Sequence, residues 1–93
     1  MSYYITRVEL HYANYADYEN LHAVMQRAGF SRVFVGDDGQ TYHLPTAEYC
    51  VYGDYDVTAV RDAAARAAAT TSKRFAVIVT KGSSLSWQGL AAA

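Results

Sequence analysis

The sequence predicts an α+β fold in which two helices cover one face of a four-stranded antiparallel sheet. Two observations support this class. Segments with the alternating pattern of β-strands stand near both ends of the chain. Segments with helical spacing of apolar residues flank a central stretch that is typical of a hairpin followed by a strand. Two interleaved right-handed βαβ crossovers in this order give a ferredoxin-like sandwich.

The composition fits one packed domain, since 52% of the 93 residues are hydrophobic. The formal charge of −1 argues against a strongly basic nucleic-acid surface but leaves room for a local basic patch. Cys50, the single cysteine, cannot form an internal disulfide, and we expect it to be a small buried residue. Because neither a signal-peptide pattern nor an apolar segment of about 18 residues is present, we expect a cytoplasmic protein.

The first strand is predicted over Tyr3–Tyr12, where residues that face a core alternate with residues of the other face. The core-facing set is Tyr4, Thr6, Val8 and Leu10, and the other set is Ile5, Arg7, Glu9 and His11. The first helix is predicted over Tyr15–Ala28, with Asn14 as its N-cap and Asp17 as the capping-box partner. Gly29 then suits the left-handed conformation that often ends a helix.

Short strands are predicted in the middle of the chain. Arg32–Gly36 and Gln40–Leu44 are joined by Asp37–Gly39, which is a strong signal for a tight turn. Pro45 has no N–H group to donate, so we expect it to end this pairing. Ala47–Gly53 is then predicted as the third main strand.

The second helix is predicted over Val57–Thr70, with Asp54 or Asp56 as its N-cap. The apolar segment Lys73–Lys81 is predicted as a central strand. Leu85–Leu90 is compatible with a short extra strand, and residues 91–93 are expected to fray. These elements predict one ferredoxin-like domain over residues 1–90.

The sheet face away from the helices is expected to mix apolar and charged side chains. It would show Ile5, Phe34 and Ile78 among Arg7, Arg32 and Arg74. Because such a face is typical of an interface, we expect a homodimer that pairs across it. Nine tyrosines fit strands, but they also fit base stacking or an aromatic interface, so composition leaves both interpretations open.

Histidines are the residues on which a catalytic site could be built, since the chain has no glycine-rich phosphate loop, no HExxH and no nucleophile elbow. Each of His11, His22 and His43 alone is more typical of a hydrogen-bonded structural residue. Metal-free RNA cleavage through the 2′-hydroxyl needs such groups and a cation at the phosphate. No zinc site is predicted, because no two histidines have ligand spacing and no second cysteine exists.

Basic residues at the starts of predicted strands could gather at one end of the sheet. Arg32, Lys73 and Arg74 could hold a phosphate backbone there, and solvated surface charge is the alternative interpretation. Arg7 and Glu9 share one strand face, where a cross-strand ion pair involving Arg74 is the simpler expectation.

Three stretches of sequence resemble a known family. They are VELH at residues 8–11, the run DY..LH..M...GF.R over residues 17–32, and LPTAEY at residues 44–49. Together they resemble the type V antitoxin endoribonucleases, the GhoS-like proteins, and the match extends over most of the chain. The resemblance implies a Cas2-like ferredoxin fold that pairs through its sheets. It also implies cleavage of the transcript that encodes a small membrane-active toxin.

The resemblance also bears on individual residues. The LH step of the first helix is a functional position in the family, and it is His22 here. The Cas2 ribonucleases have a metal-binding aspartate near the end of the first strand, where this chain has Glu9 and His11. A metal mechanism of that kind is therefore not expected.

The leading hypothesis is an antitoxin-like, metal-independent endoribonuclease that acts on a toxin mRNA without a cofactor. His22 and His11 would serve as acid and base. The predicted RNA-binding residues are Arg7, Arg32, Lys73, Arg74, Tyr42 and His43. The alternative is a non-enzymatic protein-interaction module, such as a phage or mobile-element inhibitor. A small-molecule regulatory domain is the third possibility.

Overall fold

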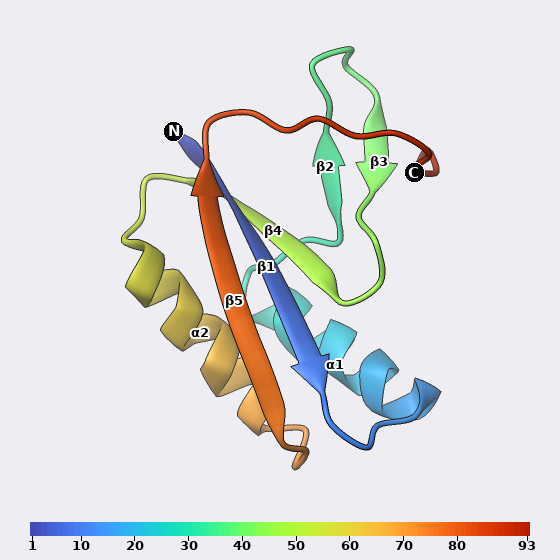
Figure 1. Ribbon diagram of the computed structural model, residues 1–93, viewed down its shortest axis with the longest axis vertical. Helices are drawn as coiled ribbons and strands as arrows, with labels where there is room; N and C mark the ends of the chain where they lie inside the picture. The colour runs from blue at the N-terminus through green and yellow to red at the C-terminus, as the bar shows by residue number, and fades with distance from the viewer.

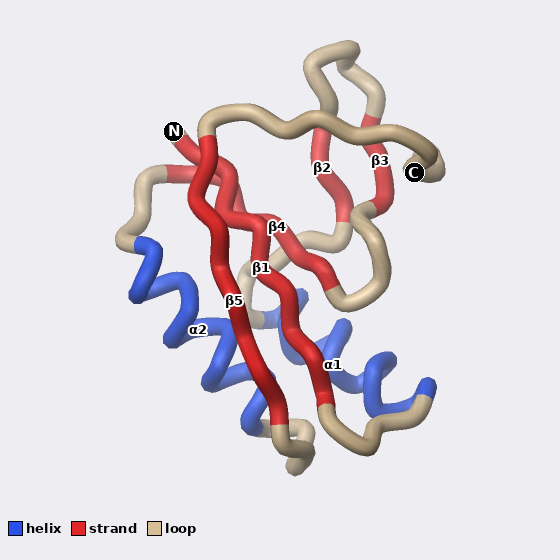
Figure 2. Tube along the Cα trace, in the orientation of Figure 1, coloured by secondary structure: helices blue, strands red, loops and turns tan.

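The computed structural model describes residues 1–93 and confirms the α+β class. Its elements are β1 (Ser2–Leu10), α1 (Tyr15–Arg27), β2 (Val33–Val35), β3 (Thr41–His43), β4 (Glu48–Gly53), α2 (Val57–Ala69) and β5 (Phe75–Gly82). Figure 1 shows both helices on the same side of the long strands, and Figure 2 shows the β2–β3 pair standing apart from them. The other side of the long strands carries no helix.

The strands form two sheets instead of the one four-stranded sheet that the sequence predicts. β1 pairs antiparallel with β4 on one side and with β5 on the other, so the three-stranded sheet has the order β4-β1-β5. β2 and β3 form a separate two-stranded ribbon. The segment predicted to be a central strand is therefore β5 at the sheet's edge, because β1 takes the middle position.

A local turn explains why the predicted fourth strand leaves the sheet. Ser31 exchanges two backbone hydrogen bonds with Cys50 of β4, at 2.9 and 2.7 Å, and this is the only bridge between the segments. The hydroxyl of Ser31 then bonds both the N–H and the C=O of Val33, at 3.1 and 3.0 Å. Such side-chain bonds to nearby backbone compete with a ladder, so the chain turns away and pairs as β2 with β3.

The core lies between the three-stranded sheet and the helices. The predicted alternation along β1 is confirmed, since the core-facing side chains of Tyr4, Thr6, Val8 and Leu10 are all buried. Leu21 and Met25 of α1 pack against this face together with Val60 and the small alanines of α2. Alanine lets α2 approach the sheet closely, which a helix with larger side chains on that stripe could not do.

The helix ends follow the sequence closely. Asn14 and Asp17 form the predicted capping box, with both side chain–backbone distances at 2.9 Å. Of the two candidates for the second cap, Asp56 is the N-cap of α2. Asp54 instead lies 3.0 Å from the amino group of Met1. Gly29 has φ +96°, the left-handed conformation expected after α1.

The C-terminal segment differs from both expectations. Leu85–Leu90 forms no strand, and residues 91–93 do not fray, because the N–H of His43 donates to Ala91 and the N–H of Ala93 donates to Thr41, both at 2.9 Å. Figure 1 shows this segment crossing from the end of β5 to lie beside β3. Trp87 is its anchor, with its ring centroid 4.9 Å from that of Phe34.

Candidate functional site

The helix-free face of the sheet carries the outward-facing residues of β1, and its charged end is the candidate site. Glu9 is on this face, and its carboxylate lies 3.3 Å from Nε2 of His11, whose side chain is 40% exposed. The N–H of His11 donates to the carbonyl of Arg74 at 2.8 Å, so Arg74 lies beside this pair. A solvent-accessible imidazole held by a carboxylate can take up and release a proton.

Arg7 lies on the same row, two residues before Glu9. Its guanidinium approaches the carboxylate of Glu48 at 3.9 Å, and the two residues stand opposite each other in the β1–β4 register. The predicted cross-strand ion pair with Arg74 is therefore not formed. Glu9 pairs with His11, which follows β1, and Arg7 pairs with Glu48 of β4. The side chain of Arg7 stays 57% exposed and can still meet an anion from solvent.

His22 occupies a different environment from His11. It lies on the sheet-facing side of α1, and its Nδ1 is 2.6 Å from the hydroxyl of Tyr49, which is fully buried on β4. Burial lowers the pKa of His22, and the nearby positive charge of Arg32 lowers it further, while Glu19 acts in the opposite direction. Burial raises the pKa of Tyr49 to about 12, so this phenol stays protonated.

The two histidines predicted to act together lie on opposite faces of the sheet. Tyr49 belongs to the helix-covered core, and His22 contacts it there. Glu9 and His11 lie on the face without helices. A general acid and a general base must both be within hydrogen-bond reach of one substrate. The structure therefore brings His11 into the candidate site and leaves His22 in the core.

The predicted phosphate-binding cations also divide between locations. Arg32 lies near α1, where its charge lowers the pKa of His22 and acts on Tyr15. Lys73 is bound at the N-terminal end of α1, with its ammonium 3.5 Å from the carboxylate of Asp17. Of the predicted cations, Arg7 and Arg74 share the helix-free face or its end with His11.

Tyr42 and His43 lie on β3, in the ribbon. The hydroxyl of Tyr42 donates to the carboxylate of Asp38 at 2.5 Å, which lowers the pKa of Asp38 and raises that of Tyr42. The ring of Tyr42 also packs against Trp87, with centroids 5.1 Å apart. Its bonds are therefore used within the ribbon, while the side chain of His43 is exposed.

An aromatic pair on the helix-free face escaped the sequence reasoning. Tyr3 of β1 and Tyr52 of β4 are opposite each other in register, with ring centroids 4.7 Å apart, and Tyr52 is 53% exposed. The only sequence signal was that both lie in strand-patterned segments rich in tyrosine. Without the register, nothing indicates that these two tyrosines of the nine meet.

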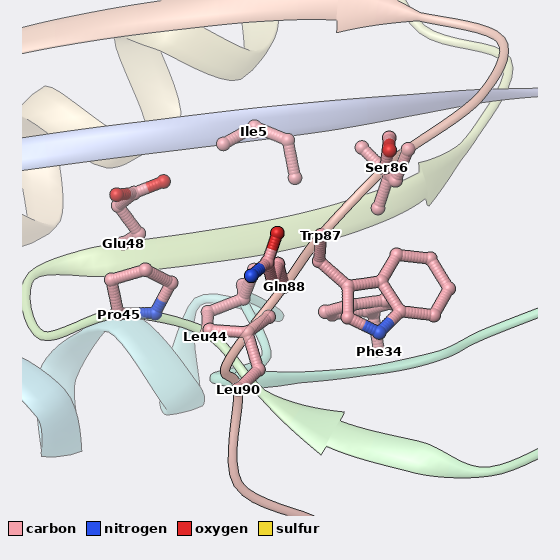
Figure 3. Close-up of a pocket in the computed structure, with 10 residues that line it drawn as sticks. Ile5, Phe34, Leu44, Pro45, Glu48, Ser86, Trp87, Gln88 and Leu90 are labelled. Carbon is pink, nitrogen blue, oxygen red and sulfur yellow. The ribbon is translucent and has the colours of Figure 1, made fainter.

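A groove of about 280 Å³ opens between the sheet and the C-terminal segment. Figure 3 shows Ile5 from β1, Phe34 from β2 and Trp87 from the C-terminal segment around it. Its lining is mostly apolar, with Glu48, Ser86 and Gln88 as polar members. The groove therefore continues the helix-free face from Arg7 and Glu48 towards the ribbon.

Cys50 is buried, and burial raises the pKa of its thiol. No three His, Cys, Asp or Glu side chains gather in a way that could hold a metal ion. Neither helix has the length and apolar content needed to cross a bilayer.

Comparison with known proteins finds no matching family model, no matching curated protein and no matching solved structure. The description of the site therefore rests on the structure of this chain. It is a small α+β protein whose helix-free sheet face combines a His11–Glu9 pair, accessible arginine and a pair of tyrosines in contact, with ring planes tilted by 49°.

Proposed function

We propose that this chain is an antitoxin-like endoribonuclease that cleaves RNA without a metal at the His11–Glu9 pair. The observation that supports this best is the accessible imidazole, held 3.3 Å from a carboxylate and accompanied by Arg7 and Arg74. The resemblance of the sequence to the GhoS-like antitoxins points to the same activity. A toxin mRNA in the cytoplasm would be the substrate.

The chemistry needs a general base, a carboxylate beside it and a cation at the phosphate, which this face supplies, and a proton from solvent. Neutral His11 accepts the proton of a ribose 2′-hydroxyl, and Glu9 stabilises the imidazolium that forms. The 2′-oxygen attacks phosphorus, the bond to the 5′-oxygen breaks, and the leaving oxygen takes a proton from solvent. The products are a 2′,3′-cyclic phosphate and a 5′-hydroxyl. Arg7 and Arg74 would meet the charge on the phosphoryl oxygens.

The same face offers contacts for bases. Tyr3 lies in the same row of β1 as Arg7, and its ring contacts that of Tyr52 on β4 beside this row. Base stacking on aromatic side chains contributes roughly 1–3 kcal/mol per base and tolerates any sequence. Single-stranded RNA is therefore the substrate form that this surface fits best, because its bases are free to stack.

We also infer that the fold is a ferredoxin-like sandwich with an interrupted second strand. The Ser31–Cys50 bridge lies beside β4, which is where the fourth strand of that topology would run. The element order β1-α1-(Ser31, β2)-β4-α2-β5 then corresponds to the βαββαβ pattern, with the β2–β3 ribbon as an elaboration.

The test is incubation of the purified protein with A/U-rich single-stranded RNA in EDTA. We expect cyclic-phosphate products, and a loss of at least about 10²-fold in rate for His11→Ala, the usual range for removing a general base. Arg66→Ala is the control, because its side chain is exposed but lies on α2, on the helix side of the sheet and away from the candidate site. Cleavage that persists at the wild-type rate in His11→Ala contradicts the proposal, as does a wild-type protein that cleaves no RNA.

A second candidate, a non-enzymatic protein-interaction module, is favoured by exposed apolar surface on the same face. Ile78 is 64% exposed in the middle of β5, and Tyr52 is 53% exposed on β4. A sheet face without helices that carries exposed apolar side chains offers a surface on which a partner protein can pack. A protein that neither binds nor cleaves RNA, but forms a complex with a host protein that Ile78→Lys abolishes, would support this function over the first.

A further inference from the structure

β5 is an uncovered edge strand, and it lacks the features with which proteins usually protect an edge. It runs for eight residues, Phe75–Gly82, and pairs only with β1. It contains no proline, and between Phe75 and Thr80 it contains no charge. Figure 1 shows no strand on the outer side of β5, where only α2 lies, packed on the covered face of the sheet. Natural edges are commonly blunted by charges, prolines or bulges, because a regular apolar edge pairs with other strands.

The backbone groups that face outward can be assigned from one hydrogen bond. The carbonyl of Arg74 accepts from His11, so Arg74 faces β1. Backbone N–H and C=O groups alternate between the two sides of a strand. The even-numbered residues of β5 therefore bond β1, and the outward set is Phe75, Val77, Val79 and Lys81. Their N–H and C=O groups have no partner strand.

We propose that β5 pairs antiparallel with β5 of a second copy of this chain, with Ile78 opposite Ile78 on the two-fold axis. The two three-stranded sheets then become one continuous six-stranded sheet. The proposal is independent of the RNA-cleaving function and differs from the face-to-face dimer that the sequence suggests.

Hydrogen-bond matching selects this register. With Ile78 on the axis, Val77 stands opposite Val79 and Phe75 stands opposite Lys81, so all four outward residues find outward partners in both chains. A shift that centres Val77 leaves Lys81 opposite Lys73, which lies before β5. A shift that centres Val79 leaves Phe75 opposite Ser83, which lies after β5. Each shift therefore loses one of the outward residues from the pairing.

The distribution of charge also favours this register. Centring Val77 sets two lysines opposite each other, and like charges directly opposite are destabilising. In the proposed register Lys81 faces Phe75 instead. Arg74 of the second copy would be near Lys81, but the two side chains lie on opposite faces of the sheet. The ammonium of Lys81 lies over the ring of Tyr4 on the helix-covered face, 5.9 Å from the ring centroid. Arg74, which directly precedes the strand, is even-numbered and therefore lies on the helix-free face, as Ile78 does.

Ile78 gains most from the pairing. Its side chain is 64% exposed in the single chain, and Ala76 and Thr80 beside it on the same face are exposed too. A central pair without backbone hydrogen bonds has Cα atoms about 4.5 Å apart, so the two isoleucines would be in contact. Each Ile78 side chain thereby covers part of the exposed apolar surface of the other, while the rest of the helix-free face stays open.

The first test is sedimentation equilibrium over a wide range of protein concentrations, combined with amide hydrogen exchange by NMR. We expect a reversible dimer and concentration-dependent protection of the amides of Val77 and Val79. A face-to-face dimer would leave these two amides unprotected, so that result overturns the proposal. A protein that remains monomeric at millimolar concentration overturns it as well.

Ile78→Lys tests the two-fold axis, because it sets two ammonium groups opposite each other at an exposed position. We expect complete loss of the dimer with an unchanged melting temperature of the monomer. Val35→Lys is the matched control, since Val35 is 59% exposed but lies on β2, away from the edge. Equal effects of the two substitutions on dimerisation contradict the proposed surface.

Oxidative cross-linking tests the register itself. Ile78→Cys should form an intermolecular disulfide in high yield, because a Cα separation of about 4.5 Å lies within the range that disulfides span. Thr80→Cys should cross-link poorly, since Thr80 faces Ala76 of the second copy. The unmodified chain controls for buried Cys50. Efficient cross-linking through Thr80→Cys but not Ile78→Cys rejects this register.

Discussion

Nδ1 of His22 on α1 and the hydroxyl oxygen of Tyr49 on β4 lie 2.6 Å apart and join the first helix to the sheet inside the core. This contact changes the role of a residue that the sequence resemblance singles out. A buried polar pair of this kind is satisfied only while both partners remain in place. His22 is thus a structural residue in this fold, and its substitution should act on stability first.

Replacing His22 by alanine should lower the free energy of unfolding by about 2–4 kcal/mol. The substitution leaves a cavity beside α1 and removes the partner of the Tyr49 hydroxyl, which is fully buried. Urea denaturation monitored by circular dichroism measures the change. His43→Ala, at an exposed position, should stay within about 0.5 kcal/mol of the wild type. Similar stabilities for the two variants would contradict the structural role of His22.

Stability should fall as the pH drops below the ordinary histidine value of 6.5, because the pKa of His22 is lowered in the folded state. Between that lowered pKa and 6.5 the unfolded chain binds a proton that the folded chain does not, so acid favours unfolding. One such group gives a slope of at most about 1.4 kcal/mol per pH unit.

Urea titrations at a series of pH values test this dependence. The His22→Gln variant keeps an amide that can bond Tyr49 but has no imidazole to titrate. Its unfolding free energy should therefore lose the slope that begins near 6.5 in the wild type. A slope of the same size in both proteins would show that another group is responsible.

Replacing Tyr42 by phenylalanine should raise the pKa of Asp38 towards its ordinary value of 3.8. The hydroxyl of Tyr42 is the largest cause of the lowering, and the N–H of Gln40, which donates to the other carboxylate oxygen at 2.9 Å, is the second. The pKa should therefore rise but stay below 3.8. Carbon-detected NMR titration of the Asp38 carboxyl measures it. The ring of the phenylalanine can still pack against Trp87, so the ribbon should remain folded.

Replacing Gly36 by alanine should displace Trp87 and destabilise the protein by about 1–3 kcal/mol, as overpacking commonly does. A Cβ atom there would lie 2.6 Å from the ring of Trp87, which is closer than van der Waals contact allows. Trp87 is the only tryptophan, so its fluorescence reports the displacement directly. Gly82→Ala is the matched control, because the nearest atom to its new Cβ is 3.9 Å away. An unchanged emission spectrum in the Gly36 variant would show that the C-terminal segment is not anchored in this way.

Features encoded within a few residues could be predicted from the sequence. The capping box of Asn14 and Asp17 follows from their spacing, and the left-handed Gly29 follows from the end of the apolar stripe. The two faces of β1 follow from alternation alone, because successive side chains of a strand point to opposite sides. Here the local preference and the final fold agree.

The division into two sheets was missed because local and long-range preferences compete there. Arg32–Gly36 has the composition of a strand, but the hydroxyl of Ser31 stabilises a turn that separates it from β4. The C-terminal residues were missed for a related reason. Their small side chains indicate no secondary structure. These residues are held in place by backbone hydrogen bonds to β3, which form only because the fold brings the two segments together.

The candidate site could be predicted only in part. Arg7, Glu9 and His11 share a face because of their spacing in one strand, so His11 and its carboxylate partner were available from the sequence. The sequence pattern did not show that three other predicted residues lie elsewhere, namely His22, Arg32 and Lys73. Their positions depend on how α1 packs on the sheet and on which charges it meets there.

The sequence by itself determined the α+β class, the helix caps and the two faces of β1, because each depends on residue spacing within a single element. Only the tertiary structure decided that Tyr3 meets Tyr52, that His22 is buried against Tyr49 and apart from His11, and that β5 forms an open edge. The physical reason is that strand register and packing between elements join residues far apart in the chain, and they are selected by the free energy of the whole core.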